Sequence, residues 1–171
     1  FDEARRVLAE FKIATAMLRV KTIEIQDDSI ENIAKTSAID ALRKTGLPLI
    51  VEDAGLFIEA LNGFPGPYSS YVYQTLGTRG VLKLMENIEK RDASFHSVIA
   101  FCGPKENPRT FQGEVKGKIS LQERGSHGFG FDPIFEPSNN SHKTFAEMSV
   151  QEKNKFSHRA QALRGFAEWY T

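Results

Sequence analysis

The chain has 171 residues, a length typical of one domain, and its 22 basic and 22 acidic residues cancel to a net charge of zero. Zero net charge argues against broad electrostatic binding to nucleic acid or to an anionic membrane. A single cysteine, Cys102, excludes an internal disulfide and fits a reducing compartment. We therefore expect one domain over residues 1–171, located in the cytoplasm, with neither nucleic acid nor membrane as a partner.

In the first third of the chain, apolar residues at helical spacing predict a helix over residues 2–18, and VKTIEI at 20–25 reads as a strand. Asp28 with Glu31 three residues later is typical of the start of a second helix, and Gly46 of its end. The apolar run over 47–51 predicts a strand buried on both faces, with Glu52 and Asp53 following at its carboxyl end.

The remaining chain alternates between strand and helix patterns. NGFPGPYSS at 62–70 predicts a loop, 78–88 a helix, and 93–102 and 109–121 two strands. GFGFDPIF over 128–135 predicts a loop rich in Gly and Phe. Ser149 with Glu152 matches a capping box that opens a short helix, and 158–170 carries the apolar face of a last one. This alternation indicates an α/β or α+β domain.

The carboxylates that follow the predicted buried strand are the first candidate functional residues. Ligands of α/β sheets bind outside the carboxyl ends of strands, and carboxylate oxygens there can hold Mg²⁺. Asp53 is the candidate ligand, and Glu24 is a plausible second one. The alternatives are a turn Asp that caps the next segment and a Glu that is solvated on its strand.

The Gly/Phe loop is the second candidate. Glycines let the backbone approach a ligand closely, and Phe rings offer a stacking face for a nucleobase. Asp132 and the exposed backbone could read base edges. The alternative is a turn whose Phe side chains fill the core.

A basic segment near a predicted helix junction is the third candidate. It contains Lys153, Lys155, Ser157, His158 and Arg159. Arg can donate two parallel hydrogen bonds to a planar acceptor, and Lys supplies a point charge. The alternative is a basic helix face exposed to solvent.

Together and in this order, the segments resemble the inosine triphosphate pyrophosphatase family over nearly the whole chain. The matching pieces are EIQ at 24–26, VEDAGL at 51–56, GFPGPYS at 63–69, GFGFDPIF at 128–135, TFAEMS at 144–149 and EKNKFSHR at 152–159. The resemblance implies hydrolysis of inosine, deoxyinosine and xanthosine triphosphates to the monophosphate and pyrophosphate, with Mg²⁺ as cofactor and a homodimer as assembly. We expect an α/β fold whose mixed central sheet forms two lobes around a substrate cleft.

The resemblance also assigns roles to residues. Asp53 matches the essential acid that coordinates metal and helps to activate water, and Glu24 looks like the second carboxylate of the metal site. Ala54 matches a position beside the substrate. The residues that match the family's base-binding loop and purine contacts are Phe129, Gly130, Phe131, Asp132, Lys153, Ser157, His158 and Arg159.

One departure concerns the phosphates. Members of the family begin with a strand and a [ST]-x-N-x-x-K loop that grips the triphosphate, and neither the Asn nor the Lys has a counterpart here. Either the sequence omits an N-terminal segment, or this protein lacks part of its phosphate site. We expect the 171-residue chain that starts at Phe1 to be poorly stable and nearly inactive, and a protein extended upstream by about 15–20 residues to be folded and active.

Two other function classes stay open at this stage. One is a hydrolase on a related scaffold that takes modified pyrimidine nucleotides. The other is a nucleotide-binding module without catalysis, which the departure at the N-terminus suggests. Turnover of a nucleotide panel separates the first from the purine enzyme, and tight binding without pyrophosphate release identifies the second.

Overall fold

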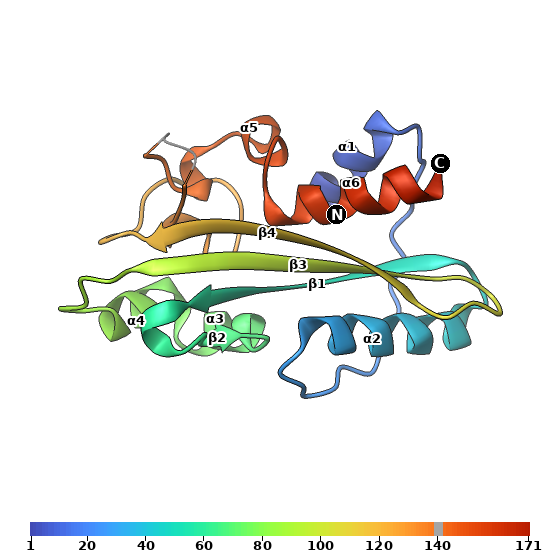
Figure 1. The fold of residues 1–171 in the computed structure, drawn as a ribbon, viewed down its shortest axis with the longest axis horizontal. Helices are drawn as coiled ribbons and strands as arrows, with labels where there is room; N and C mark the ends of the chain where they lie inside the picture. The colour runs from blue at the N-terminus through green and yellow to red at the C-terminus, as the bar shows by residue number, and fades with distance from the viewer. Residues whose placement is uncertain (139–141) are drawn as a thin grey trace. The chain divides into compact units, whose positions relative to one another are not determined.

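The computed structural model describes residues 1–138 and 142–171, drawn in Figure 1. It divides into two compact units. Unit 1 comprises 1–54, 97–113 and 158–171, and unit 2 comprises 55–96 and 114–157. No helix in the described ranges combines the length and the apolarity needed to cross a membrane.

The elements follow one another in a mixed α and β order. They are α1 (Asp2–Glu10), α2 (Ile30–Thr45), β1 (Leu49–Ile58), the 3₁₀ turn η1 (Glu59–Leu61), β2 (Pro65–Gly66), α3 (Ser69–Thr75), α4 (Gly77–Leu84), β3 (Asp92–Cys102), β4 (Arg109–Ile119), η2 (Asp132–Ile134), β5 (Phe135–Pro137), η3 (Phe145–Glu147), α5 (Val150–Asn154) and α6 (His158–Tyr170). The predicted α/β class is confirmed.

The strands form one five-stranded sheet in the order β2-β1-β3-β4-β5. We expected a mixed sheet. Strand β1 pairs with β2, and β4 pairs with β5, both in antiparallel orientation. Strands β1, β3 and β4 are long enough to contribute residues to both units.

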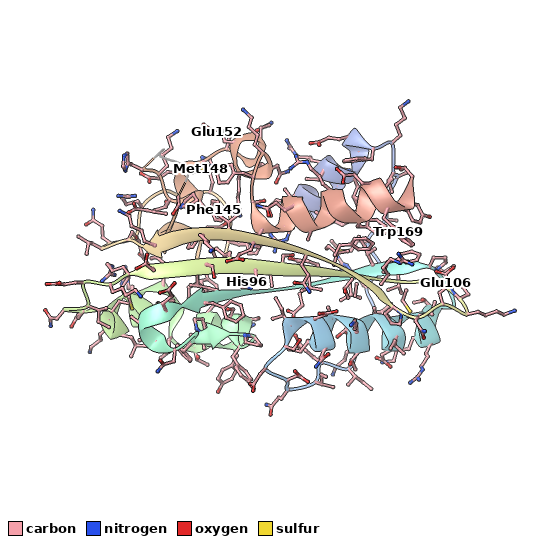
Figure 2. The ribbon with its side chains drawn as sticks, viewed as in Figure 1. His96, Glu106, Phe145, Met148, Glu152 and Trp169 are labelled. Atoms are coloured by element: carbon pink, nitrogen blue, oxygen red, sulfur yellow. The ribbon has the colours of Figure 1, made fainter. Side chains whose placement is uncertain are left out.

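Unit 1 is built from helices on the strands. Figure 1 places α2 on one side of the strands of this unit, and α1 with α6 on the other. The apolar face of α1, with Val7 and Leu8, packs with Leu163 and Phe166 of α6 in one buried cluster. Trp169, labelled in Figure 2, adds ring contacts at the end of α6.

Unit 2 has its own core, which is rich in Phe. Phe95, Phe135 and Phe145 lie within 6 Å of one another, ring centre to ring centre. Phe145 is labelled in Figure 2, next to Met148, which is buried in the same cluster. This core fixes the backbone on which the Gly/Phe loop begins and ends.

Helix α1 is shorter than the predicted helix over 2–18. It ends at Glu10 because the chain turns through Lys12, whose φ of 60° is left-handed. The N–H of Ile13 then donates to the carbonyl of Leu8 at 3.1 Å, and the N–H of Lys12 donates to that of Ala9 at 3.0 Å. These bonds satisfy the last carbonyls of the helix, as in a Schellman cap. A Lys at this position gives no sequence signal of a helix end.

The predicted strand over 20–25 is wrong: these residues have no regular secondary structure. Their backbone groups bond to side chains of α2 instead. The N–H of Ile23 donates to Asp40 at 2.9 Å, and its carbonyl accepts from Ser37 at 3.0 Å. Lys44 donates to the carbonyl of Lys21 at 2.8 Å. The segment containing Glu24 is therefore anchored by a helix.

Helix α2 begins one residue later than predicted. Ser29, not Asp28, is its N-cap, and the Ser29 hydroxyl accepts from the N–H of Asn32 at 3.3 Å. Its end at Gly46 is confirmed, with a left-handed φ of 69°. A run of Asp and Ser offers several caps in succession, so the sequence alone places the start only to within a residue.

The predicted loop over 62–70 is wrong in part, because it contains β2 and the first residues of α3. From residue 77 on, the chain follows the prediction closely. The strands expected over 93–102 and 109–121 are β3 and β4, and the helix over 78–88 is the shorter α4. The capping box at Ser149 and Glu152 is confirmed at the start of α5, and α6 covers 158–170 as expected. Signals within one turn are satisfied locally, which explains this agreement.

Candidate functional site

Asp53 lies within strand β1, which runs from Leu49 to Ile58, and not after its end as the sequence suggested. The strand continues because Leu56 and Ile58 are fully buried in the core of unit 2. Its start at residues 49–51 is only partly buried, so the expectation of a strand buried on both faces is wrong there.

The Asp53 carboxylate has one satisfied oxygen and one unsatisfied oxygen. Oδ1 accepts from the N–H of Ala54 at 3.0 Å. Oδ2 is buried and, among the described residues, has no hydrogen-bond partner. A buried carboxylate oxygen without a partner is costly, so it marks a place where a ligand would supply the missing interaction.

Burial raises the pKa of Asp53 to about 6, and the negative charges of Glu52 and Glu24 act in the same direction. The hydrogen bond from Ala54 opposes them but does not cancel them. Perturbed carboxylates of this kind gather at functional sites. The alternative of an ordinary turn Asp is wrong, because Asp53 is neither in a turn nor a cap.

The donor set around Asp53 fits Mg²⁺. The charge of Glu24 acts on Asp53 within unit 1, and Glu24 is exposed. Within the described ranges no group of three or more His, Cys, Asp or Glu side chains could hold a metal. Mg²⁺ needs no such cage, because it keeps several waters and binds through one or two carboxylates plus substrate phosphates. The two carboxylates and the unsatisfied oxygen meet that requirement.

Glu52, the neighbour of Asp53 on β1, takes part in a different set of contacts. Its Oε1 accepts from Nε of Arg159 at 2.9 Å and from the hydroxyl of Ser97 at 2.9 Å. Nη1 of Arg159 lies 2.6 Å from Oε2 of Glu3. Burial alone would lower the pKa of Arg159, but the two carboxylates raise it above its usual value.

The basic segment is not a solvated face at four of its five residues, so that alternative holds only for Lys155, which is exposed. Arg159 and Lys153 are largely buried, and so are Ser157 and His158. Ser157 lies just before α6, and its N–H donates to the carbonyl of Lys153 at 2.9 Å. His158 is the first residue of α6.

The Gly/Phe loop in unit 2 presents one of its three Phe rings to solvent, since Phe135 is fully buried. Phe129 is 59% exposed, whereas Phe131 is 3% exposed and meets Tyr73 edge to face at 5.5 Å. Phe131 therefore fills the core, as the alternative interpretation has it. Phe129 is left as the stacking face that this loop can offer to a base.

A buried ion pair holds the loop in shape. Nζ of Lys153 lies 2.7 Å from Oδ2 of Asp132, and each side chain is 4% exposed. The same oxygen accepts from the N–H of Phe129 at 3.0 Å. Lys153 also lies 5.3 Å from the centre of the Phe129 ring. The pair thus fixes both the backbone and the ring of Phe129.

Two glycines complete the loop, for different reasons. Gly128 and Gly130 both have left-handed φ values, of 75° and 61°. A Cβ at Gly128 would also collide with the Asp132 carboxylate, whereas a Cβ at Gly130 would meet open space. Gly128 is therefore required by space as well as by conformation.

The predicted site residues thus fall into one group in each unit. Unit 1 holds Glu24, Asp53, Ala54, His158 and Arg159, and unit 2 holds Phe129, Gly130, Phe131, Asp132, Lys153 and Ser157. Neither Glu3 nor Ser97 was predicted as a functional residue. The partner of Glu3 is Arg159 and the partner of Ser97 is Glu52, both distant in the chain, and only the folded structure brings these residues together.

A cavity of about 550 Å³ lies in unit 1. Its wall is mainly aliphatic and aromatic, and it includes Glu52 and Arg159. Asp53 and Glu24 do not line it. A triphosphate needs charged and polar donors, so we do not assign the phosphate site to this cavity.

Known proteins are similar to this chain over most of its length. A protein from Methanopyrus kandleri named dITP/XTP pyrophosphatase is 51% identical over 170 residues, which cover 99% of this chain and 90% of that one. A protein of the same name from Methanothermobacter marburgensis is 54% identical over 143 residues, covering 84% of this chain and 76% of that one.

Solved structures of Ham1 proteins are also similar to this chain. A HAM1 protein from Coxiella burnetii superimposes with a TM-score of 0.83 at 32% identity, over 99% of this chain and 91% of that one. The Ham1 protein of Staphylococcus aureus gives 0.80 at 30% identity, over 89% and 81%. The family model described as the Ham1 family matches residues 1–169. This chain therefore belongs to the Ham1 family.

Proposed function

We propose that this protein is a dITP/XTP pyrophosphatase, which hydrolyses deoxyinosine, inosine and xanthosine triphosphates to the monophosphate and pyrophosphate. The observation that carries the proposal is Asp53. It combines a raised pKa of about 6, a buried oxygen without a partner, and a neighbouring carboxylate, Glu24. The names of the relatives supply the substrate class.

Asp53 is the proposed general base. A water oxygen attacks the α-phosphorus, and the bond from that phosphorus to the oxygen bridging to the β-phosphorus breaks. Pyrophosphate leaves with the bonding electron pair, and the water proton passes to Asp53. A carboxylate with a pKa near 6 is a stronger base than an ordinary Asp and is still ionised at neutral pH.

Glu24 and Asp53 are the proposed ligands of Mg²⁺. The bound ion would neutralise phosphate charge and make water easier to deprotonate. The unsatisfied Oδ2 of Asp53 supports this assignment.

Each unit contains proposed base contacts of its own. In unit 2 the exposed ring of Phe129 stacks on the base, while Lys153 and Asp132 hold the loop. In unit 1 the guanidinium of Arg159 donates to a keto oxygen. Hypoxanthine and xanthine accept a hydrogen bond at position 6, whereas the 6-amino group of adenine donates one, so such a donor rejects adenine. Ala54, Gly130, Ser157 and His158 remain predicted contacts of the substrate.

The proposal extends to the setting of the enzyme. A nucleotide-pool hydrolase with one cysteine fits the cytoplasm, and we propose a homodimer as its assembly. Sedimentation of the purified chain at micromolar concentration tests the dimer directly.

A pyrophosphate-release assay tests the function. The panel contains dITP, ITP, XTP, dGTP, dATP and a pyrimidine nucleotide such as dUTP, each with Mg²⁺ and with excess EDTA. We expect turnover of the first three to be far faster than that of dATP and dUTP, and to require Mg²⁺. Preference for the pyrimidine nucleotide would refute the substrate class. Tight binding of dITP without pyrophosphate release would refute the enzymatic activity.

A further inference from the structure

A chain of hydrogen bonds in unit 1 ends at Arg159 and begins at a residue with no assigned role. Ser97 lies on β3 and is fully buried. Its hydroxyl donates to Oε1 of Glu52 at 2.9 Å, and the same oxygen accepts from Nε of Arg159 at 2.9 Å. Ser97 therefore acts on Arg159 through Glu52 alone.

These contacts fix the plane of the guanidinium. Glu52 bonds to Nε and Glu3 to Nη1, on two different nitrogens of one rigid, planar group. The carboxylate of Glu52 can rotate about its own side-chain bonds. The hydroxyl of Ser97 sets that rotation, because it donates to the oxygen that holds Nε.

We propose, resting on the proposed function, that Ser97 and Glu52 are positioning residues for base selectivity. They orient the guanidinium of Arg159 toward the 6-keto oxygen of the base. The preference for deaminated purines over adenine therefore depends on a serine that does not contact the substrate. A small rotation of the guanidinium weakens a hydrogen bond to a keto oxygen, because hydrogen bonds lose strength steeply away from linearity.

Replacing Arg159 itself cannot test this idea cleanly. Arg159→Ala would leave Glu3 and Glu52 without the cation between them, in a largely buried place. Loss of stability would then accompany any loss of selectivity. Ser97→Ala leaves all three charges in place and removes only the hydroxyl.

The matched control is Ser120→Ala. Ser120 is a buried serine of unit 2 whose hydroxyl donates to the carbonyl of Gln122 at 2.7 Å. Both variants delete one buried hydroxyl and one hydrogen bond, and they are expected to lower the melting temperature to a similar degree. Only Ser97 is linked to Arg159.

The experiment measures kcat and KM for dITP and dATP, together with the melting temperature, in the wild type and both variants. For Ser97→Ala we expect KM for dITP to rise about 3- to 10-fold, the range of one lost hydrogen bond, with kcat changed less than about twofold. The preference for dITP over dATP falls by the same factor. Ser120→Ala keeps the wild-type preference.

Glu52→Gln gives an independent test in case Ser97→Ala does not fold. The amide oxygen can still accept, but the charge that holds Nε is gone, so the dITP preference is expected to fall as well. Wild-type preference in the soluble variants, with only a lower melting temperature, would overturn the proposal and make Ser97 a purely structural residue. If the wild type did not hydrolyse dITP, the proposed function would be overturned as well. That result would come from the wild-type assay, before any variant is made.

Discussion

Asp53→Asn is predicted to make the protein more stable and nearly inactive at once. The amide keeps the shape of the carboxylate but cannot ionise, so it avoids the repulsion from Glu52 and Glu24 and the cost of burying a charge. It also cannot accept a proton from water, and it is a poorer ligand for Mg²⁺.

The magnitude follows from the pKa. A rise from the ordinary value of 3.8 to about 6 corresponds to about 3 kcal/mol of penalty on the ionised form. Because Asp53 is only partly buried, solvent screens its charge, and we expect about 1–2 kcal/mol. In a domain of this size that raises the melting temperature by about 3–6 °C.

The pH dependence has a definite sign. Below 3.8 the carboxyl is protonated in both the folded and the unfolded chain, so it costs nothing. Between 3.8 and about 6 only the unfolded chain releases the proton, so the stability of the wild type falls as the pH rises; above about 6 the penalty is constant. The advantage of Asp53→Asn is therefore full at pH 8 and about a third as large at pH 4.5.

Thermal melts at both pH values, with the turnover of dITP at pH 8, check this prediction. Asp92→Asn is the control, since Asp92 is an exposed carboxyl at the start of β3 and should change neither quantity. We expect kcat to fall by at least about 100-fold. The reasoning is wrong if Asp53→Asn keeps a tenth of the wild-type kcat, or if its melting temperature at pH 8 is no higher than that of the wild type.

Three further predictions concern the Gly/Phe loop. Lys153→Met should lower the free energy of unfolding by about 3 kcal/mol in chemical denaturation, because it leaves the Asp132 carboxylate buried without its cation; equal stability would contradict the ion pair. Gly128→Ala should cost about 2 kcal/mol by the same measurement and clearly more than Gly130→Ala, which shares the left-handed φ but has open space for a Cβ. Phe129→Ala should raise KM for dITP by about 5- to 100-fold without changing the melting temperature, and Phe129→Trp should restore it; an unchanged KM in the alanine variant would exclude the stacking role.

The elements that the sequence predicted well are those set by nearby residues. The capping box of Ser149 and Glu152 and the left-handed end at Gly46 are decided within one helical turn. The prediction of a strand over 20–25 failed because a strand needs a neighbouring strand to pair with. The alternation of residue types does not show whether such a strand is present. Its backbone bonds to Asp40 and Ser37 of α2 could not be read from the local pattern.

In the candidate site, too, local signals were readable from the sequence and contacts between distant residues were not. Asp53 was predicted as a site residue because a carboxylate beside an apolar run is a local signal, and its raised pKa supports that prediction. Which Phe of the loop is exposed was left open, because burial of Phe131 depends on Tyr73, far away in the chain. Glu3 went unnoticed since its ion pair with Arg159 joins the two ends of the sequence.

The placement of Glu52 and Asp53 on one strand has a consequence for how this segment can vary. Adjacent residues of a strand point to opposite faces, so the pleat of β1 keeps the guanidinium of Arg159 with Glu52 and away from Asp53. Insertion or deletion of one residue between Leu49 and Val51 would exchange the two faces. Asp53 would then meet the cation and lose its basicity, while Glu52 would lose its partner. Substitutions in the short run before Glu52 are therefore far more tolerable than any change in its length.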